Sequence, residues 1–352
     1  MELRIFQVID ALDYGDAVSN HCIELYRALN TLGYTTQIYS KFTHEKVVDY
    51  RESFEKIKVR DEDIIIFHFS GKSQLVKELN KLNCKKILIY HNITPHFYFE
   101  GMEPHFSHCL EGREQLQELS GKFDLYLGDS LFNVEELKLL GCTPCEVLPI
   151  VVDLDVKKER KNTVLFKMDN VGEKFIFVGR VAPNKKHEDI IRVFDYFYTY
   201  INPRAELYLI GNYNDYLPYY NRITELSSKL ASRNNIFFTG KVSGEELDFH
   251  YKSADAFLSM SEHEGFCVPL LESMSYGIPT FAFDAGAISS TMGPAGIKLK
   301  SKDPADVAEL IHYVLEDKDL RMKIVENQYN WLDHFSNENT IKTLKRVIEQ
   351  VK

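Results

Sequence analysis

Two short stretches of the chain carry groups suited to bind an anionic, hydroxyl-rich ligand. The first, residues 261–274 (SEHEGFCVPLLESM), lies where an expected strand passes into an expected helix. Pro269 suits the first helical turn and Gly277 suits the position after the last, which marks both ends of that helix. The backbone amides near Gly265 and Cys267 would then project from a helix N-terminus, where anions bind.

Two carboxylates belong to the same stretch. Glu264 lies at the mouth of the expected anion site, and Glu272 lies one turn into the helix, where it can accept hydrogen bonds from sugar hydroxyls. Gly265 lets a ligand approach the backbone because it has no Cβ. The alternative interpretation makes Glu264 a helix-end charge and Glu272 a solvated helix residue.

The second stretch, residues 175–186 (FIFVGRVAPNKK), is an expected strand that runs into a turn before a helix. Arg180 and Lys185 lie on this turn. The guanidinium presents a fork of donors and the ammonium a point charge, so the two can clamp a diphosphate. They would also stabilise the charge that develops on a departing phosphate. The alternative is a surface turn with ordinary solubilising lysines.

These residues need a scaffold, and the hydrophobic pattern predicts one. Short β-branched runs alternate with longer amphipathic runs along the whole chain. Strands are expected at residues 3–9, 34–39, 63–69, 86–90, 125–127, 146–149, 174–178, 206–210, 235–239, 256–260 and 280–283. Helices are expected at residues 18–32, 187–198, 219–231, 243–252, 268–276, 304–315 and from about 321 to the end. This order predicts an α/β fold of two doubly wound parallel sheets facing a central cleft that holds the site.

Composition and charge exclude several classes of protein. The 352 residues are 44% hydrophobic and 27% charged, which is enough for two globular domains. The net charge of −10 argues against binding of nucleic acid through its phosphates. No apolar run is long enough to span a bilayer, the first residues lack a signal-peptide core, and six scattered cysteines form no disulfide framework. A cytoplasmic protein is therefore expected.

Three motifs in a fixed order resemble those of the retaining glycosyltransferases of family 4, which have the GT-B fold. They are G-R-x4-K at residues 179–185, G-K-V-S at residues 240–243 and E-x7-E at residues 264–272. The resemblance spans nearly the whole chain and is sharpest over residues 177–286. Residues 14–20 (YGDAVSN), 91–95 (HNITP) and 261–266 (SEHEGF) look like the bacterial surface-polysaccharide branch of that family.

The resemblance implies a role for each site residue. Arg180 and Lys185 would hold the donor diphosphate, Glu272 would bind the ribose hydroxyls, and Glu264 would bind the transferred sugar. The remaining donor-binding positions would be His91 at the sugar, Gly15 and Gly179 at the diphosphate loops, Lys241 and Val242 at the base, and the backbone of Gly265, Phe266, Cys267 and Val268. The predicted catalytic group is Arg180, Lys185, Glu264 and His91. Since Asn184-Lys185-Lys186 departs from the family's commoner Lys-Gly, either lysine could face the phosphate, and Lys185 is preferred.

The family also implies a reaction and a division into domains. A hexose would pass from a GDP- or UDP-sugar to a hydroxyl of a glycan or lipid-linked acceptor in surface-polysaccharide synthesis, with retention and without a metal or other cofactor. The expected domains are an acceptor-side domain at 1–155, a nucleotide-sugar-binding domain at 156–330 and a C-terminal helix at 331–352 that returns to the first domain. A GT-B sugar-nucleotide epimerase, which needs no acceptor, and a non-catalytic glycan-binding subunit are the alternatives.

Other groupings carry weaker signals. Cys142 and Cys145 form a CxxC that follows an expected helix and precedes a strand, the reverse of a thioredoxin-type pair. Structural zinc with His105, His108 and Cys109 is the alternative.

The charged run 157–162 is a predicted linker, and Asp153 and Asp155 are predicted loop residues rather than metal ligands. The aromatic loop at 97–106 either packs on the domain edge or forms an acceptor wall. Five lysines give either a solvated face or a peripheral contact with anionic lipid: Lys72, Lys77, Lys81, Lys85 and Lys86.

Overall fold

The computed structural model describes residues 2–152 and 172–352. The chain divides into two compact units, and the first joins the residues up to Val152 to the C-terminal segment Phe335–Lys352. The second unit ends at His334. The predicted boundary between residues 155 and 156, the predicted linker at 157–162, and Asp153 and Asp155 lie outside the described residues.

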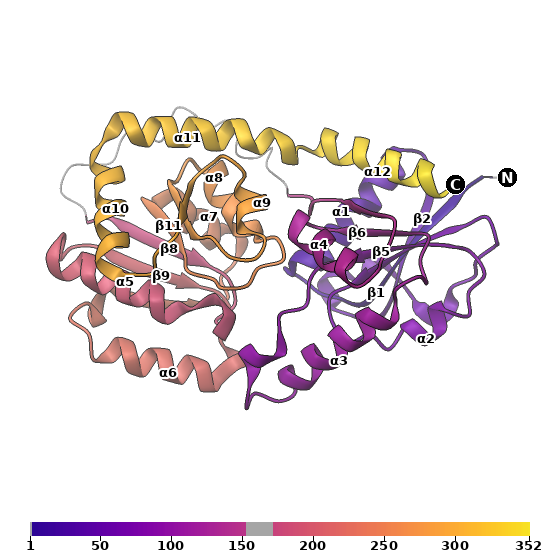
Figure 1. Cartoon of the computed structure of the whole chain (residues 1–352), viewed down its shortest axis with the longest axis horizontal. Coiled ribbons are helices and arrows are strands. Elements are labelled where there is room, and N and C mark those ends of the chain that lie inside the picture. Colours follow the sequence, from indigo (N-terminus) through magenta and orange to yellow (C-terminus); the bar gives the residue numbers. More distant parts are fainter. Residues whose placement is uncertain (1, 153–171) are drawn as a thin grey trace. The chain divides into compact units, whose positions relative to one another are not determined.

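The first unit is built on a parallel sheet in the order β3-β2-β1-β4-β5-β6-β7. Figure 1 labels β1, β2, β5 and β6 of this sheet. Its strands are β1 (Arg4–Leu12), β2 (Thr35–Thr43), β3 (Arg51–Ser53), β4 (Ile64–Phe69), β5 (Lys85–Tyr90), β6 (Leu125–Gly128) and β7 (Cys145–Val147). Its helices are α1 (Ala17–Thr31), α2 (Val76–Leu79), α3 (His105–Glu118), α4 (Leu131–Leu139) and α12 (Asn337–Val351), with 3-10 turns η1 (Glu45–Tyr50), η2 (Phe54–Lys56) and η3 (His96–Phe99).

Both faces of this sheet are covered, which explains why β4 begins with a continuous apolar run at residues 64–67. Ile65 and Phe67 join one buried cluster, while Ile64 and Ile66 join the cluster on the other face. The second cluster also receives an apolar stripe of α12, formed by Leu344, Val347, Ile348 and Val351. The C-terminal helix is therefore part of the core of the first unit.

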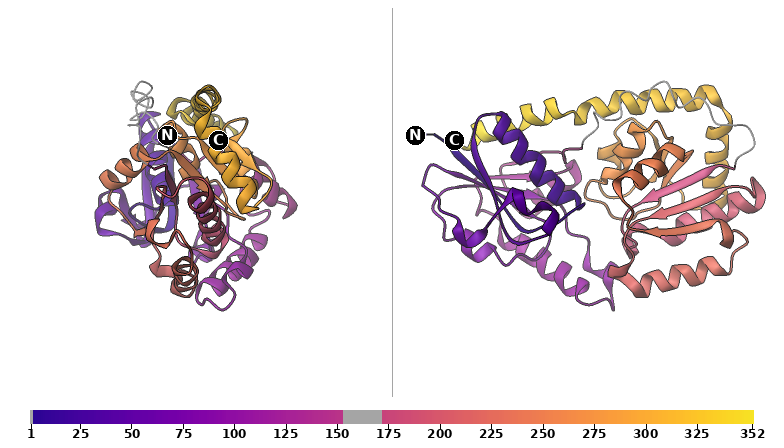
Figure 2. Two further views of the ribbon diagram at one scale, coloured as in Figure 1. Left: turned by 90° about the vertical axis from the view of Figure 1, so that its left-hand side faces the viewer. Right: turned by 180° about the vertical axis from the view of Figure 1, so that it is seen from behind.

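The second unit is a parallel sheet in the order β10-β9-β8-β11-β12-β13, whose strands run side by side in Figure 2. Its strands are β8 (Lys174–Val178), β9 (Glu206–Ile210), β10 (Ile236–Gly240), β11 (Ala256–Ser259), β12 (Thr280–Phe283) and β13 (Ile297–Leu299). Its helices are α5 (His187–Tyr200), α6 (Leu217–Ser228), α7 (Gly244–Ser253), α8 (Val268–Ser275), α9 (Ile288–Met292), α10 (Pro304–Glu316) and α11 (Lys318–Leu332). The 3-10 turns of this half of the chain are η5 (Pro183–Lys185), η6 (Asn214–Tyr216), η7 (Arg233–Asn235) and η8 (Asp333–Phe335).

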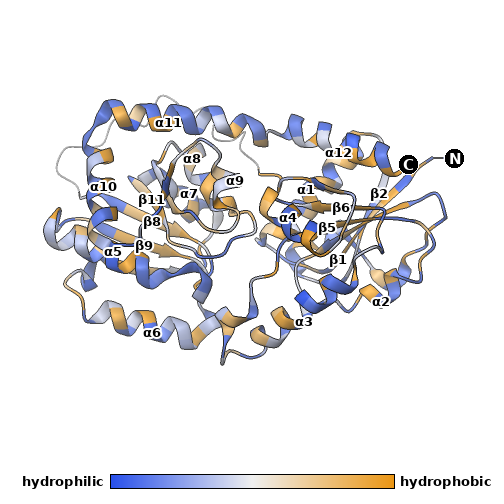
Figure 3. Cartoon of the chain, in the orientation of Figure 1, coloured by the Kyte–Doolittle hydropathy of each residue, from blue (hydrophilic) through white to orange (hydrophobic). Residues whose placement is uncertain are grey.

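The structure confirms the predicted fold class of two Rossmann-like α/β sheets. Apolar residues concentrate in the strands of both sheets, and the helices mix apolar and polar residues (Figure 3). The short strands β3 and β13 were not predicted, because three residues at a sheet edge show no periodicity. The chain was expected to be helical throughout from about residue 321, but α11 ends at Leu332 and α12 begins after Ser336, whose side chain caps the new helix.

Each sheet has one position where the strand order reverses. In the first unit this switch point lies between β1 and β4, and in the second between β8 and β11. Loops that leave the carboxyl ends of such strands diverge, so ligands of doubly wound sheets bind there. Within residues 2–152 and 172–352, every helix is too short or too polar to cross a bilayer.

Candidate functional site

The two stretches singled out by their chemistry meet at the switch point of the second sheet. Strands β8 and β11 are hydrogen-bonded neighbours, so the turn after β8 and the loop after β11 leave from the same edge. The backbone N–H of Glu262 donates to the carbonyl of Asn184 at 2.8 Å, and the Asn184 side chain donates to the carbonyl of His263 at 3.0 Å. The positions of the predicted lysines and glutamates are therefore fixed relative to one another.

Lys185 and Glu264 form an ion pair at this junction. The Lys185 Nζ lies 2.6 Å from each carboxylate oxygen of Glu264. The side chains are 20% and 7% exposed, respectively, so water screens the pair only in part. The structure thus brings together two of the four predicted catalytic residues.

Lys186 belongs to a different ion-pair group. Its Nζ lies 3.1 Å from Glu262, which also accepts from Lys302 at 2.8 Å. Lys302 in turn lies 3.0 Å from Asp189 at the start of α5. Burial raises the pKa of Glu262, but the hydrogen bonds from Lys302 and Lys186 outweigh it and leave the pKa below its usual value. This partner set separates Lys186 from the Lys185–Glu264 pair.

Arg180 is exposed immediately after β8. The turn that carries it is tied to the loop after β9, because Val181 N–H donates to the carbonyl of Asn212 at 2.9 Å. Gly211 is required at this crossing, since a Cβ there would lie 2.1 Å from the carbonyl oxygen of Gly179. Among the described residues, the Arg180 side chain forms no ion pair, so its guanidinium is available to an anion. Sequence reasoning did not single out Gly211.

The helix α8 begins where the sequence predicts. Cys267 precedes it in the left-handed region (φ 74°), Pro269 stands in its first turn, and no side chain of the described residues caps its amino end. Phe266 is buried, and its carbonyl accepts from the Thr291 hydroxyl at 2.6 Å, which fixes the approach to the helix. The amide of Val268 at the start of the helix suits an anion, whereas Pro269 has no N–H and the N–H of Leu270 donates to the Cys267 carbonyl at 3.1 Å. Burial raises the pKa of the Cys267 thiol well above its usual value, so it is no nucleophile at neutral pH.

Glu272 has a buried partner that the sequence did not reveal. The hydroxyl of Tyr251, on α7, donates to Glu272 Oε2 at 2.8 Å. The Tyr251 ring stacks on Tyr276 with a centroid distance of 4.8 Å, which holds the hydroxyl in place. Burial, together with the charge of Glu272, raises the pKa of Tyr251, so it stays a donor. Nothing in the spacing of residues 251 and 272 could predict this contact between two helices.

Lys241 and Val242 lie on the third loop of the same sheet edge, directly after β10. This loop contacts its neighbour through the N–H of Gly211, which donates to the Gly240 carbonyl at 3.0 Å. Gly240 has a positive φ of 72° and lies against Tyr213, so a side chain there would be strained. Lys241 is exposed and Val242 half-buried. Their predicted contact with a base stays a prediction.

Gly15 and His91 belong to the first unit. Gly15 has a φ of 77° in the turn between β1 and α1, at the switch point of that sheet. Asp16, the next residue, caps α1 by accepting from the N–H of Ser19 at 3.1 Å. The β1–α1 turn therefore has a left-handed backbone conformation at Gly15, which a residue with a side chain rarely adopts. The predicted contact of Gly15 with a diphosphate stays a prediction.

His91 lies in a buried polar chain that sequence reasoning missed. Its side chain is fully buried; Nδ1 lies 2.8 Å from Asp129 Oδ2 and Nε2 lies 2.9 Å from His68 Nδ1. The other ring nitrogen of His68 lies 2.9 Å from the Gln7 amide. Burial lowers the pKa of His68 and His21 and raises the pKa of Asp129. Both His91 ring nitrogens are thus engaged within the first unit, and its contact with a sugar stays a prediction.

The weaker groupings do not form a second site. No cluster of three or more His, Cys, Asp or Glu side chains suited to a metal occurs in the described part of the chain, so Cys142 and Cys145 lack the partners of a zinc site. In the aromatic loop, Phe97 is 60% exposed and Phe99 is buried. Lys81 and Lys85 pair with acidic neighbours, which reduces the positive charge of that face.

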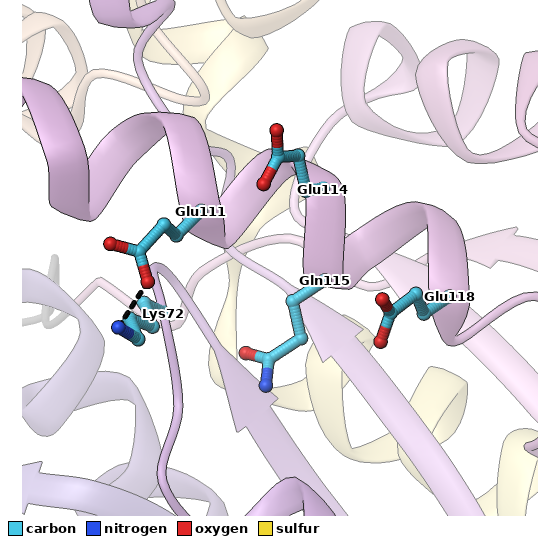
Figure 4. A pocket seen from close by; sticks show the side chains of 5 residues that line it. All are labelled: Lys72, Glu111, Glu114, Gln115 and Glu118. Carbon is cyan, nitrogen blue, oxygen red and sulfur yellow. Dashed lines mark ion pairs between the residues drawn. The ribbon is translucent and has the colours of Figure 1, made fainter.

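A pocket lies beside α3, and none of the predicted site residues lines it (Figure 4). Its lining is Lys72, Glu111, Glu114, Gln115 and Glu118, and Lys72 is paired with Glu111. Gln115 is committed to the Ser73 backbone, which donates to it at 2.8 Å and accepts from it at 3.0 Å. An acidic lining of this kind does not suit a diphosphate.

Comparisons with known proteins show which family and which fold the chain resembles. The family model "Glycosyl transferases group 1" matches residues 156–331, half of the chain. An uncharacterized glycosyltransferase of Methanocaldococcus jannaschii, MJ1607, is 30% identical over 185 residues, which cover 50% of this chain and 45% of that protein. The chain thus spans about half the length of this curated relative.

Solved structures match over the whole length at low identity. Sucrose-phosphate synthase from Thermosynechococcus elongatus has a TM-score of 0.76 at 15% identity and 99% coverage of both chains. Anabaena HepE, solved with UDP and glucose, has a TM-score of 0.74 at 14% identity, with 98% of this chain and 99% of that chain covered. These likenesses establish the GT-B fold. By its family match and its fold, the chain belongs to the glycosyl transferases group 1 family.

Proposed function

We propose that the chain is a retaining hexosyltransferase that takes its sugar from a GDP- or UDP-sugar. The observation that carries the proposal is the meeting of Arg180, the Lys185–Glu264 pair and the amino end of α8 at one switch point. That edge combines cations and the helix-start amide of Val268 for a diphosphate with carboxylates for hydroxyl groups. The UDP and glucose named with the Anabaena relative support a nucleotide-sugar donor.

Each group at this edge has a distinct task in the proposal. Arg180 and Lys185 bind the diphosphate, and the backbone from Gly265 to Val268 binds sugar and phosphate oxygens. Glu264 accepts hydrogen bonds from the transferred sugar. Glu272, oriented by the Tyr251 hydroxyl, accepts from the ribose. Lys241 and Val242 border the base.

The chemical step needs no covalent intermediate. The bond between the sugar C1 and the phosphate oxygen breaks, and the phosphate leaves with the electron pair through an oxocarbenium-like transition state. The acceptor oxygen bonds to C1 on the same face, and its proton passes to the leaving phosphate. Arg180 and Lys185 neutralise the charge that grows on the diphosphate, which is where fixed charges accelerate such a step most. Those two cations supply the charge that a metal would otherwise supply.

The first unit contributes the acceptor side in this proposal. Gly15 lets the β1–α1 turn approach the diphosphate, and His91 contacts the donor sugar through its backbone or by exchanging one of its ring hydrogen bonds. The exposed Phe97 offers an aromatic face to a sugar ring of the acceptor. The acceptor is a glycan or a lipid-linked glycan of a surface polysaccharide.

A two-step experiment tests the proposal. UDP- and GDP-hexoses are first screened by thermal shift, because a bound donor stabilises the folded state by mass action. The donor that binds is then incubated with glycan acceptors in the presence of EDTA, and NMR identifies the anomeric configuration of the product. Transfer with retention supports the proposal. Conversion of the nucleotide sugar without an acceptor, or inversion, contradicts it.

A further inference from the structure

The Lys185–Glu264 pair places a cation for the diphosphate and an anion for the sugar in direct contact. The ammonium lies 2.6 Å from both carboxylate oxygens, so it is directed at Glu264 rather than shared with a distant group. A phosphate oxygen that binds this ammonium must share it with the carboxylate or displace it. The two halves of a donor therefore act on one ion pair.

The backbone on both sides of the pair is held in place. On the Lys185 side, Asn184 is bonded to the loop through both its carbonyl and its side chain. On the other side, the N–H of Ala287 donates to the Glu264 carbonyl at 2.9 Å, and Gly286 packs so closely that a Cβ would lie 2.7 Å from the same oxygen. The backbone of Glu264 therefore keeps its place when the lysine leaves, and only the side-chain torsions can move the carboxylate.

Separation of the pair therefore has an energetic consequence at Glu264. Its side chain is only 7% exposed, and a buried carboxylate that loses its cation is strongly destabilised. Hydroxyl donors of a sugar at the same carboxylate would replace the lost interaction. A nucleoside diphosphate lacks the transferred hexose and therefore supplies no hydroxyl donor to Glu264.

We propose that the Lys185–Glu264 pair couples recognition of the diphosphate to recognition of the sugar, so that the site favours an intact nucleotide sugar over the nucleoside diphosphate product. This inference rests on the proposed function of the same site. Coupling of this kind is reciprocal: the sugar strengthens diphosphate binding, and the diphosphate frees the carboxylate for the sugar. After transfer, Glu264 recaptures Lys185 and the nucleoside diphosphate is released.

Calorimetric titration of a donor and of its nucleoside diphosphate tests the coupling. The wild type should bind UDP-hexose or GDP-hexose, whichever is the donor, more tightly than UDP or GDP. In Glu264→Gln the anion that competes for Lys185 is gone, so the nucleoside diphosphate should bind about tenfold more tightly. The nucleotide sugar should bind no more tightly than before, and the preference for it should shrink.

Asp284→Asn is the matched control. It removes one negative charge from the same edge of the sheet, but Asp284 pairs with Lys300 and Ser289 rather than with Lys185. If tighter binding came only from a less negative surface, both variants would show it. We expect a change of less than about twofold for Asp284→Asn, because the charge of Asp284 is already paired with Lys300 and does not compete for Lys185.

The outcomes separate this inference from the proposed function. If neither nucleotide sugars nor nucleoside diphosphates bind the wild type, both fail. If the wild type transfers sugar but Glu264→Gln and Asp284→Asn have the same affinity for the nucleoside diphosphate, only the coupling is overturned. If Glu264→Gln does not fold, Glu264→Asp takes its place. Its carboxylate lies one methylene farther from Lys185, so we expect a smaller gain in affinity for the nucleoside diphosphate. The absence of any gain would overturn the coupling.

Discussion

Lys185 and Lys186 are neighbours in the chain, yet their ammonium groups have different partners. Lys185 pairs with Glu264, while Lys186 pairs with Glu262 in the group that includes Lys302. The left-handed conformation of Lys186 (φ 51°) turns the chain between the two side chains. The preference for Lys185 as the lysine that meets the diphosphate, already drawn from the sequence, stays a prediction.

Replacement of each lysine by Met tests that assignment. Lys185→Met should lower kcat/KM for the donor by about 100-fold, the usual effect of losing one charge that stabilises a transition state. Lys186→Met keeps the same stem and removes the same charge, and it should lower kcat/KM by less than about threefold. Steady-state kinetics with varied donor measure both. A larger loss in Lys186→Met than in Lys185→Met would reverse the assignment.

The hydrogen bond from Tyr251 to Glu272 makes a second prediction about single residues. Tyr251→Phe keeps the stacked ring and removes the donor that orients the carboxylate. We expect KM for the donor to rise about fivefold with little change in kcat, since ribose binding is the same in ground and transition states. Tyr276→Phe is the control, because its hydroxyl donates to Asp248 at 2.6 Å and not to Glu272. Equal KM values for the two variants would refute the orienting role.

At the scale of elements, the strands and helices that position the site follow from local pattern. The apolar run before Gly179 and the Pro269 and Gly277 signals place β8 and α8 correctly. The Lys185–Glu264 contact joins residues 79 positions apart, and the His91–Asp129 contact joins residues 38 apart. Pairings at such separations depend on strand order, which hydrophobic periodicity does not encode.

His187, the first residue of α5, makes the second unit sensitive to acid. Its ring is fully buried against Phe177 and Tyr219, and among the described residues neither ring nitrogen has a hydrogen-bond partner. Burial, with a smaller effect from Lys185, lowers the pKa of His187 to about 3. The unfolded chain therefore binds a proton at His187 that the folded unit does not bind. The free energy of unfolding falls as the pH drops below the unfolded pKa of about 6.5.

His187→Phe should remove this part of the pH dependence. For one such histidine, the free energy of unfolding falls by about 1.5 kcal/mol between pH 6.5 and pH 5. Urea unfolding followed by fluorescence of Trp331, the one tryptophan of the chain, reports on the second unit. The wild type should lose that much more stability than His187→Phe over this interval. Parallel pH profiles of the two proteins would disprove the prediction.

At the scale of the whole molecule, the chain forms two units with one parallel sheet each, and the first unit is built from two separate stretches of the sequence. The family model covers residues 156–331, while α12 packs in the core of the first unit. The periodicity of α12 predicts its apolar stripe, whereas the return of this helix to the first domain was an expectation from the family resemblance and not from periodicity. The order of the motifs along the chain predicts the family, but it does not predict which residues contact one another in the folded chain.

The packing of α12 predicts how the first unit responds to truncation of its stripe. Leu344 is 1% exposed within the cluster that contains Ile64 and Ile66. Leu344→Ala should lower the free energy of unfolding of the first unit by about 3 kcal/mol, through lost burial and the cavity left behind. The exposed neighbour Lys345 serves as control, and Lys345→Ala should change stability by less than about 0.5 kcal/mol. Urea unfolding followed by circular dichroism measures both, and equal effects would contradict the assigned core.

The turnover of Arg180→Ala tests the central claim most directly. Arg180 is exposed at the switch point, so its loss should leave the Trp331 unfolding transition unchanged while kcat for sugar transfer falls by about 100-fold. Arg233→Ala, which removes an exposed arginine just before β10 at the opposite edge of the same sheet, should keep wild-type turnover. Near-normal turnover of a folded Arg180→Ala protein would contradict the claim that this edge of the second unit stabilises a departing diphosphate.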